Sequence, residues 1–350
     1  MELILHIGDM KTGSSSIQAT LETNRALLRE AGYFYPPCGK YENHVLLTLP
    51  ALSRVPRQFA HVDTRETLLT RAERHWAKIA AAVGKHAPEK VILSAENLLG
   101  LRASEVPAFL QLVQRHVPGI TSTTAICYLR RNSSHYTSRL QQRIKASSLL
   151  PPLQPNSYAP KLAQWADQVD RLVVREMARD TLTGGDVVPD FLHTALGEAQ
   201  PAGLIAERRN ETISAEGMLV LRRFRRTALP DKDGLFDPMS TQVLRIIRAV
   251  EAEKGEALAL TRPRLKEECR LFLDSDSEDL QLVRDRYGLD LCDPAARAEA
   301  PAFDPEQPLD RMIDIDPDKA LRLYDEVLAQ LALEARKDRA QLRVKATPKG

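Results

Sequence analysis

The hydrophobic pattern of the chain begins with a short apolar run, "LILHI", that ends in a glycine-containing loop. The stretch "SSSIQATLETNRALLREAGY" follows, and its apolar positions Ile17, Leu21, Leu27 and Leu28 recur at near-helical spacing before Gly32. A buried strand is typically a short continuous apolar run, whereas a surface helix shows a period of about 3.6 residues. The first 32 residues therefore predict a strand, a loop and a helix.

The same alternation of strands and helices recurs further along the chain. Apolar runs in "KVILSAENL", "STTAICYLR" and "RLVVRE" predict three more strands, and "SEVPAFLQLVQRHVPG" predicts a helix capped by Ser104. After the last strand, Gly184 and Gly185 turn the chain into a predicted helix that ends near Gly197. Strands that alternate with helices favour a parallel sheet. The predicted fold class is α/β, of the P-loop type, with a mostly parallel sheet flanked by helices.

Other segments predict loops and a helical C-terminal part. The irregular residues 50–64 predict a loop over the sheet edge, and the proline-rich stretch 147–160 predicts a second loop. After Gly203 the periodicity is mainly helical. We expect an α/β domain over residues 1–300 and a helical extension over 301–350.

Composition narrows the function classes only modestly. The chain has 350 residues, 43% of them hydrophobic, and a net charge of +2, so its overall charge predicts no nucleic-acid partner. No apolar run is long enough for a signal sequence or a membrane span, which predicts a cytoplasmic protein. Its four separated cysteines predict free thiols, and its two tryptophans are predicted to lie in the core.

The loop after the first strand contains the main candidate chemistry. Gly8 and Gly13 have the glycine spacing of a nucleotide-binding P-loop, in which backbone N–H groups surround phosphates. In an ATPase-type loop a lysine follows the second glycine, but here that position is Ser14 and the lysine is Lys11, inside the loop. The spacing predicts a phosphate-binding loop that differs from the ATPase type.

Three predicted strands carry polar residues at their carboxyl ends: residues 11–16, 94–97 and 130–138. Ligands of open α/β sheets bind outside the carboxyl ends of the strands, so these segments can converge on one crevice. Helices that begin near Gly13 and Asn132 would direct N–H groups and the positive ends of their dipoles toward it. This arrangement predicts a ligand with more than one phosphate.

These motifs resemble those of the sulfotransferases that use 3′-phosphoadenosine 5′-phosphosulfate (PAPS). "KTGSSS" after a first strand is similar to the family's 5′-phosphosulfate loop. "YLRRNSSHYTSRLQQ" is similar to its 3′-phosphate segment, in which a serine follows a strand-end arginine by eight positions, as Ser138 follows Arg130. Three further segments resemble the sequences of bacterial members in their order and residue pattern: "VILSAENL", the segment from Tyr158 to Gly197, and "NETISAEGMLVLRR". The resemblance covers about residues 3–290.

The resemblance implies a role for each residue of the two motifs. Lys11 would stabilise the oxygen that leaves between phosphate and sulfate, while Thr12, Gly13, Ser14, Ser15 and Ser16 hold the 5′-phosphate. Arg130 and Ser138 would bind the 3′-phosphate, and 3′,5′-adenosine bisphosphate (PAP) would be the product. Because sulfuryl transfer develops less negative charge than phosphoryl transfer, a lysine and backbone N–H groups can suffice without a metal.

Two residues are candidates for the base that activates the acceptor. His44, in "YENHVLL", stands where related bacterial members often have a histidine, and Glu96 follows the "VILS" strand and resembles the catalytic glutamate of some branches. We favour His44, because its segment is expected to be free to approach the acceptor while Glu96 has an orienting role available. His6 lies inside the first strand and is expected to be a core residue or to support the site indirectly.

Other interpretations remain open at this level. A P-loop kinase or NTPase would require the missing lysine after Gly13, and a nucleotide-binding protein without transfer activity would share the same loop. The acceptor is expected to be a carbohydrate or a small metabolite with a hydroxyl or amine, and neither its identity nor the oligomeric state follows from the sequence. An arginine cluster fits either an acidic substrate or a solvated helix face: Arg222, Arg223, Arg225 and Arg226.

Overall fold

The structure is a computed structural model that describes residues 1–9, 11–56, 59, 62–208 and 212–346. The chain divides into two compact units, which are treated separately. The first unit comprises Met1–Arg131, Asn156–Asn210 and Ser277–Cys292. The second comprises Asn132–Pro155, Glu211–Asp276 and Asp293–Gly350.

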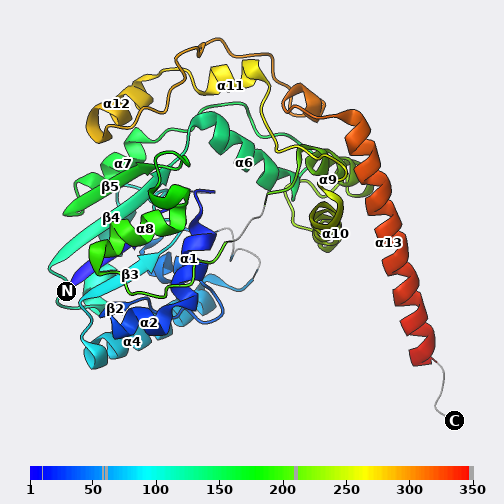
Figure 1. The fold of residues 1–350 in the computed structure, drawn as a ribbon. Helices are drawn as coiled ribbons and strands as arrows, with labels where there is room; N and C mark the ends of the chain where they lie inside the picture. Colours follow the sequence, from blue (N-terminus) through cyan, green and yellow to red (C-terminus); the bar gives the residue numbers. More distant parts are fainter. Residues whose placement is uncertain (10, 57–58, 60–61, 209–211, 347–350) are drawn as a thin grey trace. The chain divides into compact units, whose positions relative to one another are not determined.

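The first unit contains a five-stranded sheet in the order β2-β3-β1-β4-β5 (Figure 1). All four strand pairs are parallel, and β1 lies in the centre, where His6 is in register with Ser94 of β3 and Ile126 of β4. This confirms an α/β fold with a parallel sheet. The strands are β1 Glu2–His6, β2 Tyr33–Phe34, β3 Lys90–Ser94, β4 Ser122–Leu129 and β5 Arg171–Glu176.

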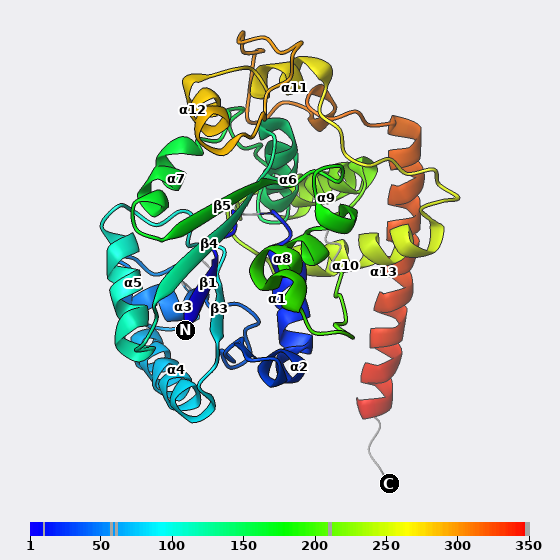
Figure 2. The ribbon, with the colours of Figure 1, turned by 60° about the vertical axis from the view of Figure 1, so that its left-hand side comes forward.

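Helices cover both faces of this sheet because successive strand residues point to opposite sides. On β1, Leu3 and Leu5 enter one core cluster and Ile4 enters the other. The first cluster includes α3 Val45–Thr48, α4 Arg65–His86, α5 Glu105–His116, α7 Ala159–Ala166 and α12 Glu278–Tyr287. The second includes α1 Ser14–Thr23, α2 Arg25–Glu30 and α8 Val187–Leu196, and Figure 2 shows α1 and α8 together on one side of the strands.

The second unit is helical and has its own core. Its boundaries differ from the expected division at residue 300, because helices before and after that point share one hydrophobic cluster. Leu140, Met218 and Ile247 pack in this cluster with Leu323 and Val327 of the last helix. The helices are α6 Asn132–Ile144, α9 Ala215–Ala228, α10 Pro238–Lys254, α11 Glu267–Leu273 and α13 Pro317–Ala346.

Most predicted elements of the first unit are confirmed, with three local differences. The two-residue strand β2 was not expected, and the first predicted helix breaks at Asn24 into α1 and α2. Ser104 precedes α5 but its side chain makes no capping hydrogen bond; the carboxylate of Glu105 instead accepts from the backbone N–H of Arg102 at 3.0 Å. Trp76 and Trp165 are fully buried, as predicted.

Candidate functional site

The loop between β1 and α1 closes on itself, and glycine makes this closure possible. A Cβ atom at Gly8 would lie 2.5 Å from Ser14 Oγ, so the two ends of the loop are in contact. Lys11 and Gly13 have positive φ angles of 69° and 82°, a conformation that glycine adopts without strain and other residues adopt rarely. Thr12 is buried, and its hydroxyl donates to the backbone oxygen of Asp9 at 2.8 Å.

Helix α1 begins directly at this closed turn. Gly13 is its N-cap residue, and no side chain caps it. The first N–H groups of a helix have no partner within the helix, and with the helix dipole they make the N-terminus favourable for an anion. The structure thus brings the predicted residues 11–16 into one turn and the start of one helix, with Ser14 buried and Lys11, Ser15 and Ser16 half-buried.

The end of β4 places Arg130 beside this loop. Its guanidinium Nη2 lies 3.5 Å from Met177 Sδ, and the methyl carbon of Met177 would lie 3.1 Å from a Cβ at Gly13. Burial lowers the pKa of Arg130, and the nearby Tyr158 and Asp9 oppose this shift. The predicted phosphate-binding arginine is therefore near the loop within the first unit.

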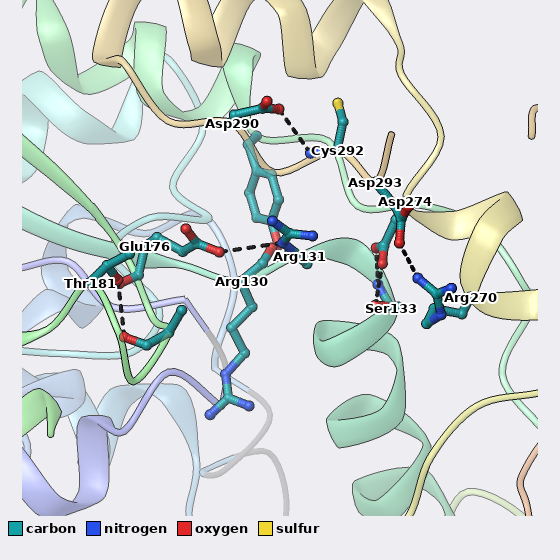
Figure 3. Close-up of polar contacts among 12 residues, drawn as sticks. Arg130, Arg131, Ser133, Glu176, Thr181, Arg270, Asp274, Asp290, Cys292 and Asp293 are labelled. Atoms are coloured by element: carbon teal, nitrogen blue, oxygen red, sulfur yellow. Dashed lines mark hydrogen bonds and ion pairs between the residues drawn. The ribbon is translucent and has the colours of Figure 1, made fainter. Parts of the chain in front are cut away.

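Arg131, the residue after Arg130, forms an ion pair with a carboxylate. Arg131 Nε lies 3.5 Å from a carboxylate oxygen of Glu176, and Figure 3 shows Arg130 extending away from that pair. Arg130 belongs to the first unit and Ser138, on α6, to the second. Their pairing at one phosphate stays a prediction.

The N-terminus of α6 has a partner within the second unit, which corrects the expectation that it would serve a ligand. Asp274 is 2% exposed and accepts from the backbone N–H of Ser133 at 2.8 Å and from its hydroxyl at 2.6 Å (Figure 3). A carboxylate at a helix N-terminus satisfies the same N–H groups and dipole that a phosphate would. Asp274 therefore accepts from one of the N–H groups at the start of α6 that were expected to face an anionic ligand.

His44 has the environment of a structural residue. It is 2% exposed, its Nε2 lies 2.8 Å from the backbone oxygen of Pro36, and its Nδ1 accepts from the backbone N–H of Ser94 at 2.9 Å. Burial lowers its pKa to about 4, so the ring is neutral at pH 7. The reason for favouring His44, a segment free to approach an acceptor, does not hold, since both ring nitrogens are occupied by backbone groups.

Glu96 lies at the edge of the sheet where the loop lies. It is half-buried in the turn after β3, the strand that pairs with β1. The neighbouring Asn97 donates to the hydroxyl of Thr48 at 2.8 Å, which connects this turn to α3. Of the two candidates, Glu96 has the position that better suits a base for an acceptor at this edge.

A buried polar network beneath the loop was not expected from the sequence. His6 Nδ1 lies 2.8 Å from Ser94 Oγ, which also accepts from Gln18 Nε2 at 3.0 Å. The three side chains come from β1, β3 and α1 and are buried. The sequence predicted His6 as a core residue or an indirect support of the site, and the fold adds its partners Ser94 and Gln18, which come from distant segments.

Two arginines of the α9 cluster, Arg222 and Arg225, are buried. They therefore neither form a solvated helix face nor are accessible to an acidic substrate. Arg222 and Arg225 are 5% and 1% exposed, and they donate mainly to backbone oxygens of surrounding loops. For Arg225 the acceptors include Lys232 O at 2.6 Å and Ser240 Oγ at 2.7 Å. These two arginines hold loops in place.

A cavity of about 560 Å³ in the first unit is lined by residues of α8 and of the segment 198–208, and none of its lining residues is a predicted site residue. Asp186 and Arg208, 3.2 Å apart, lie at its polar side. Among the described residues, no cluster of three or more metal-ligating side chains is found, and no helix has the length and apolar character to cross a membrane. Comparison of the chain with protein-family models, curated proteins and solved structures gives no match.

Proposed function

We propose that this protein is a sulfotransferase that moves a sulfuryl group from PAPS to a hydroxyl or amine of a carbohydrate or small-metabolite acceptor. The observation that supports it best is the closed loop at the carboxyl end of the central strand, with Lys11 inside it and Arg130 beside it. A half-buried arginine next to the loop suits a nucleotide that carries a second phosphate on its ribose.

In this proposal the loop holds the reacting end of the donor. Backbone N–H groups at the start of α1 and the hydroxyls of residues 14–16 bind the 5′-phosphate, whereas the buried hydroxyl of Thr12, which donates to the backbone oxygen of Asp9, stabilises the loop itself and not the ligand as expected. The acceptor oxygen attacks sulfur while the bond from sulfur to the bridging oxygen breaks, and PAP leaves. Lys11 stabilises the charge that develops on this oxygen, an interaction that is stronger in the transition state than in the ground state.

The remaining roles are assigned to Arg130 and Glu96. Arg130 binds the 3′-phosphate, and the carboxylate of Glu96 accepts the proton of the attacking hydroxyl. No metal takes part in this mechanism. The kcat of Glu96→Gln should fall about 10² to 10⁴-fold, with PAP binding retained. A folded His44→Gln variant should retain most of the wild-type kcat.

Binding of PAP tests the proposal directly. PAP should raise the Tm clearly more than ATP with Mg²⁺, because only PAP carries the 3′-phosphate that Arg130 is proposed to bind. Arg130→Ala should weaken PAP binding by about 2–4 kcal/mol. Arg131→Ala is the matched control, since its side chain pairs with Glu176. Equal Tm shifts from PAP and from ATP with Mg²⁺ would favour a kinase or NTPase instead.

Turnover separates a transferase from a protein that only binds nucleotide. Lys11→Ala should lower kcat about 10²-fold or more with a much smaller effect on PAP affinity. The exposed Lys85, at the end of α4, gives a control variant of the same kind, Lys85→Ala. PAP binding without transfer to any of a panel of sugars and small alcohols would favour a binding protein.

A further inference from the structure

Two buried polar atoms next to the loop have no hydrogen-bond partner among the residues that the structure describes. They are Nε2 of His6, a residue with no exposed surface, and Oγ of Ser14, which is 3% exposed. Leaving a buried donor or acceptor unpaired costs folding free energy, so native proteins rarely do it without a reason. A bound ligand that supplies the missing partner is one such reason.

Both atoms border the same small space. A Cβ atom at Gly8 would lie 3.2 Å from His6 Nε2 and 2.5 Å from Ser14 Oγ, so the two side chains approach Gly8 from different elements. The imidazole edge that faces Gly8 is the one that carries the unpaired nitrogen. This space adjoins the uncapped start of α1, where backbone N–H groups favour an anion.

The hydrogen bonds of Ser94 favour one of the two neutral tautomers of His6. Ser94 is fully buried, and its hydroxyl oxygen already accepts from Gln18 Nε2. The acceptor described for the single Ser94 hydroxyl proton is His6 Nδ1, at 2.8 Å. A neutral imidazole that accepts at Nδ1 carries its proton at Nε2. His6 therefore presents an N–H donor toward the loop.

We infer that His6 Nε2–H donates a hydrogen bond to an oxygen of the tetrahedral oxyanion that the loop binds. This inference rests on the proposed function, in which that oxyanion is the 5′-phosphate of PAPS and PAP. Ser14 Oγ is the second buried group that the same oxyanion satisfies. His6 is a binding residue and not an acid, because burial lowers its pKa to about 3 and keeps the ring neutral.

Two substitutions of His6 separate its two hydrogen bonds. In His6→Asn the side-chain amide can replace Nδ1 toward Ser94 but does not reach the position of Nε2. In His6→Gln the longer side chain places an amide N–H near the position of Nε2. His6→Asn should weaken PAP binding about tenfold or more in titration calorimetry, while His6→Gln should stay within about threefold of the wild type.

Adenosine 3′-monophosphate is the matched ligand, because it lacks the 5′-phosphate. Its affinity should be the same for the wild type and for His6→Asn. An unchanged PAP affinity in a folded His6→Asn variant would overturn the inference, as would an equal loss for both ligands.

Inorganic pyrophosphate separates this inference from the proposed function. If the wild type binds pyrophosphate but not PAP, and His6→Asn weakens pyrophosphate binding about tenfold, the sulfotransferase proposal fails and the role of His6 stands. If the wild type transfers sulfate and His6→Asn binds PAP and pyrophosphate normally, the role of His6 fails alone.

The wild-type protein provides a test that does not depend on a variant. Nitrogen-15 NMR of the histidine side chains should show His6 protonated at Nε2, and PAP should move its Nε2–H proton to lower field. Assignment of this signal follows from its loss in His6→Gln, whose fold is checked by tryptophan fluorescence. A proton at Nδ1 in the wild type would contradict the inference.

Discussion

The buried His44 should make the first unit lose stability as the pH falls below about 6.5. In the folded protein its pKa is lowered to about 4, and in the unfolded chain it returns to 6.5. A group with a lower pKa in the folded state binds more protons after unfolding, so its effect is absent above pH 6.5 and grows as the pH falls toward 4. Acid therefore favours the unfolded state.

The size of the effect follows from these two pKa values. At pH 5 the unfolded histidine is almost fully protonated and the folded one is almost fully neutral, which lowers the free energy of unfolding by about 2 kcal/mol. His6, with its pKa lowered to about 3, should contribute a similar amount. The wild type should therefore lose about 4 kcal/mol between pH 7.5 and pH 5 from these two residues, and His44→Gln about half as much.

Urea unfolding at pH 7.5 and pH 5 measures this difference. Both tryptophans of the chain, Trp76 and Trp165, are buried in the first unit with His44, so their fluorescence reports on that unit. The exposed His86 gives the control His86→Gln, which should keep the full wild-type loss. The reasoning is refuted if His44→Gln loses as much stability on acidification as the wild type.

Three further substitutions test local features of the structure. Gly13→Ala should destabilise the first unit by more than about 1 kcal/mol in urea unfolding, because φ is 82° and its Cβ would lie 2.5 Å from Val187 Cγ1; adding Val187→Ala should restore only part of the loss. Asp274→Ala should speed hydrogen exchange in the first turn of α6 by a factor that corresponds to about 1–3 kcal/mol, and unchanged exchange would argue against its capping role. Arg225→Met should lower the Tm by several degrees because it leaves buried carbonyl groups unpaired, whereas the exposed Arg226→Met should have little effect.

The hydrophobic pattern by itself determined the order of the main elements and the position of the loop. Apolar runs and glycines are local signals, and they predicted β1 and the start of α1 close to their observed bounds. The glycine spacing predicted the place of a loop, and the structure shows the closure there, because a residue without a side chain is needed where backbone segments touch or φ is positive. The sulfotransferase activity stays a proposal that rests on this loop, on Arg130 and on the family resemblance.

Tertiary structure alone decided which polar side chains are available to a ligand. His44 and Glu96 both looked suitable as bases in the sequence, but the backbone of Pro36 and Ser94 occupies both nitrogens of His44. Ser94 lies 50 residues from His44, and the Pro36 contact depends on how the intervening loop folds, so the local pattern encodes neither.

The same holds for the helix termini and the charged clusters. The sequence predicted an N–H-rich helix start near Asn132, but the carboxylate that satisfies it, that of Asp274, comes from far along the chain. From the sequence, Arg222 and Arg225 fitted either a solvated helix face or a site for an acidic substrate. In the structure both are buried, and they donate to loop carbonyl groups of the second unit. A local pattern predicts where a polar group lies along an element, whereas its hydrogen-bond partner depends on which distant segments the fold brings next to it.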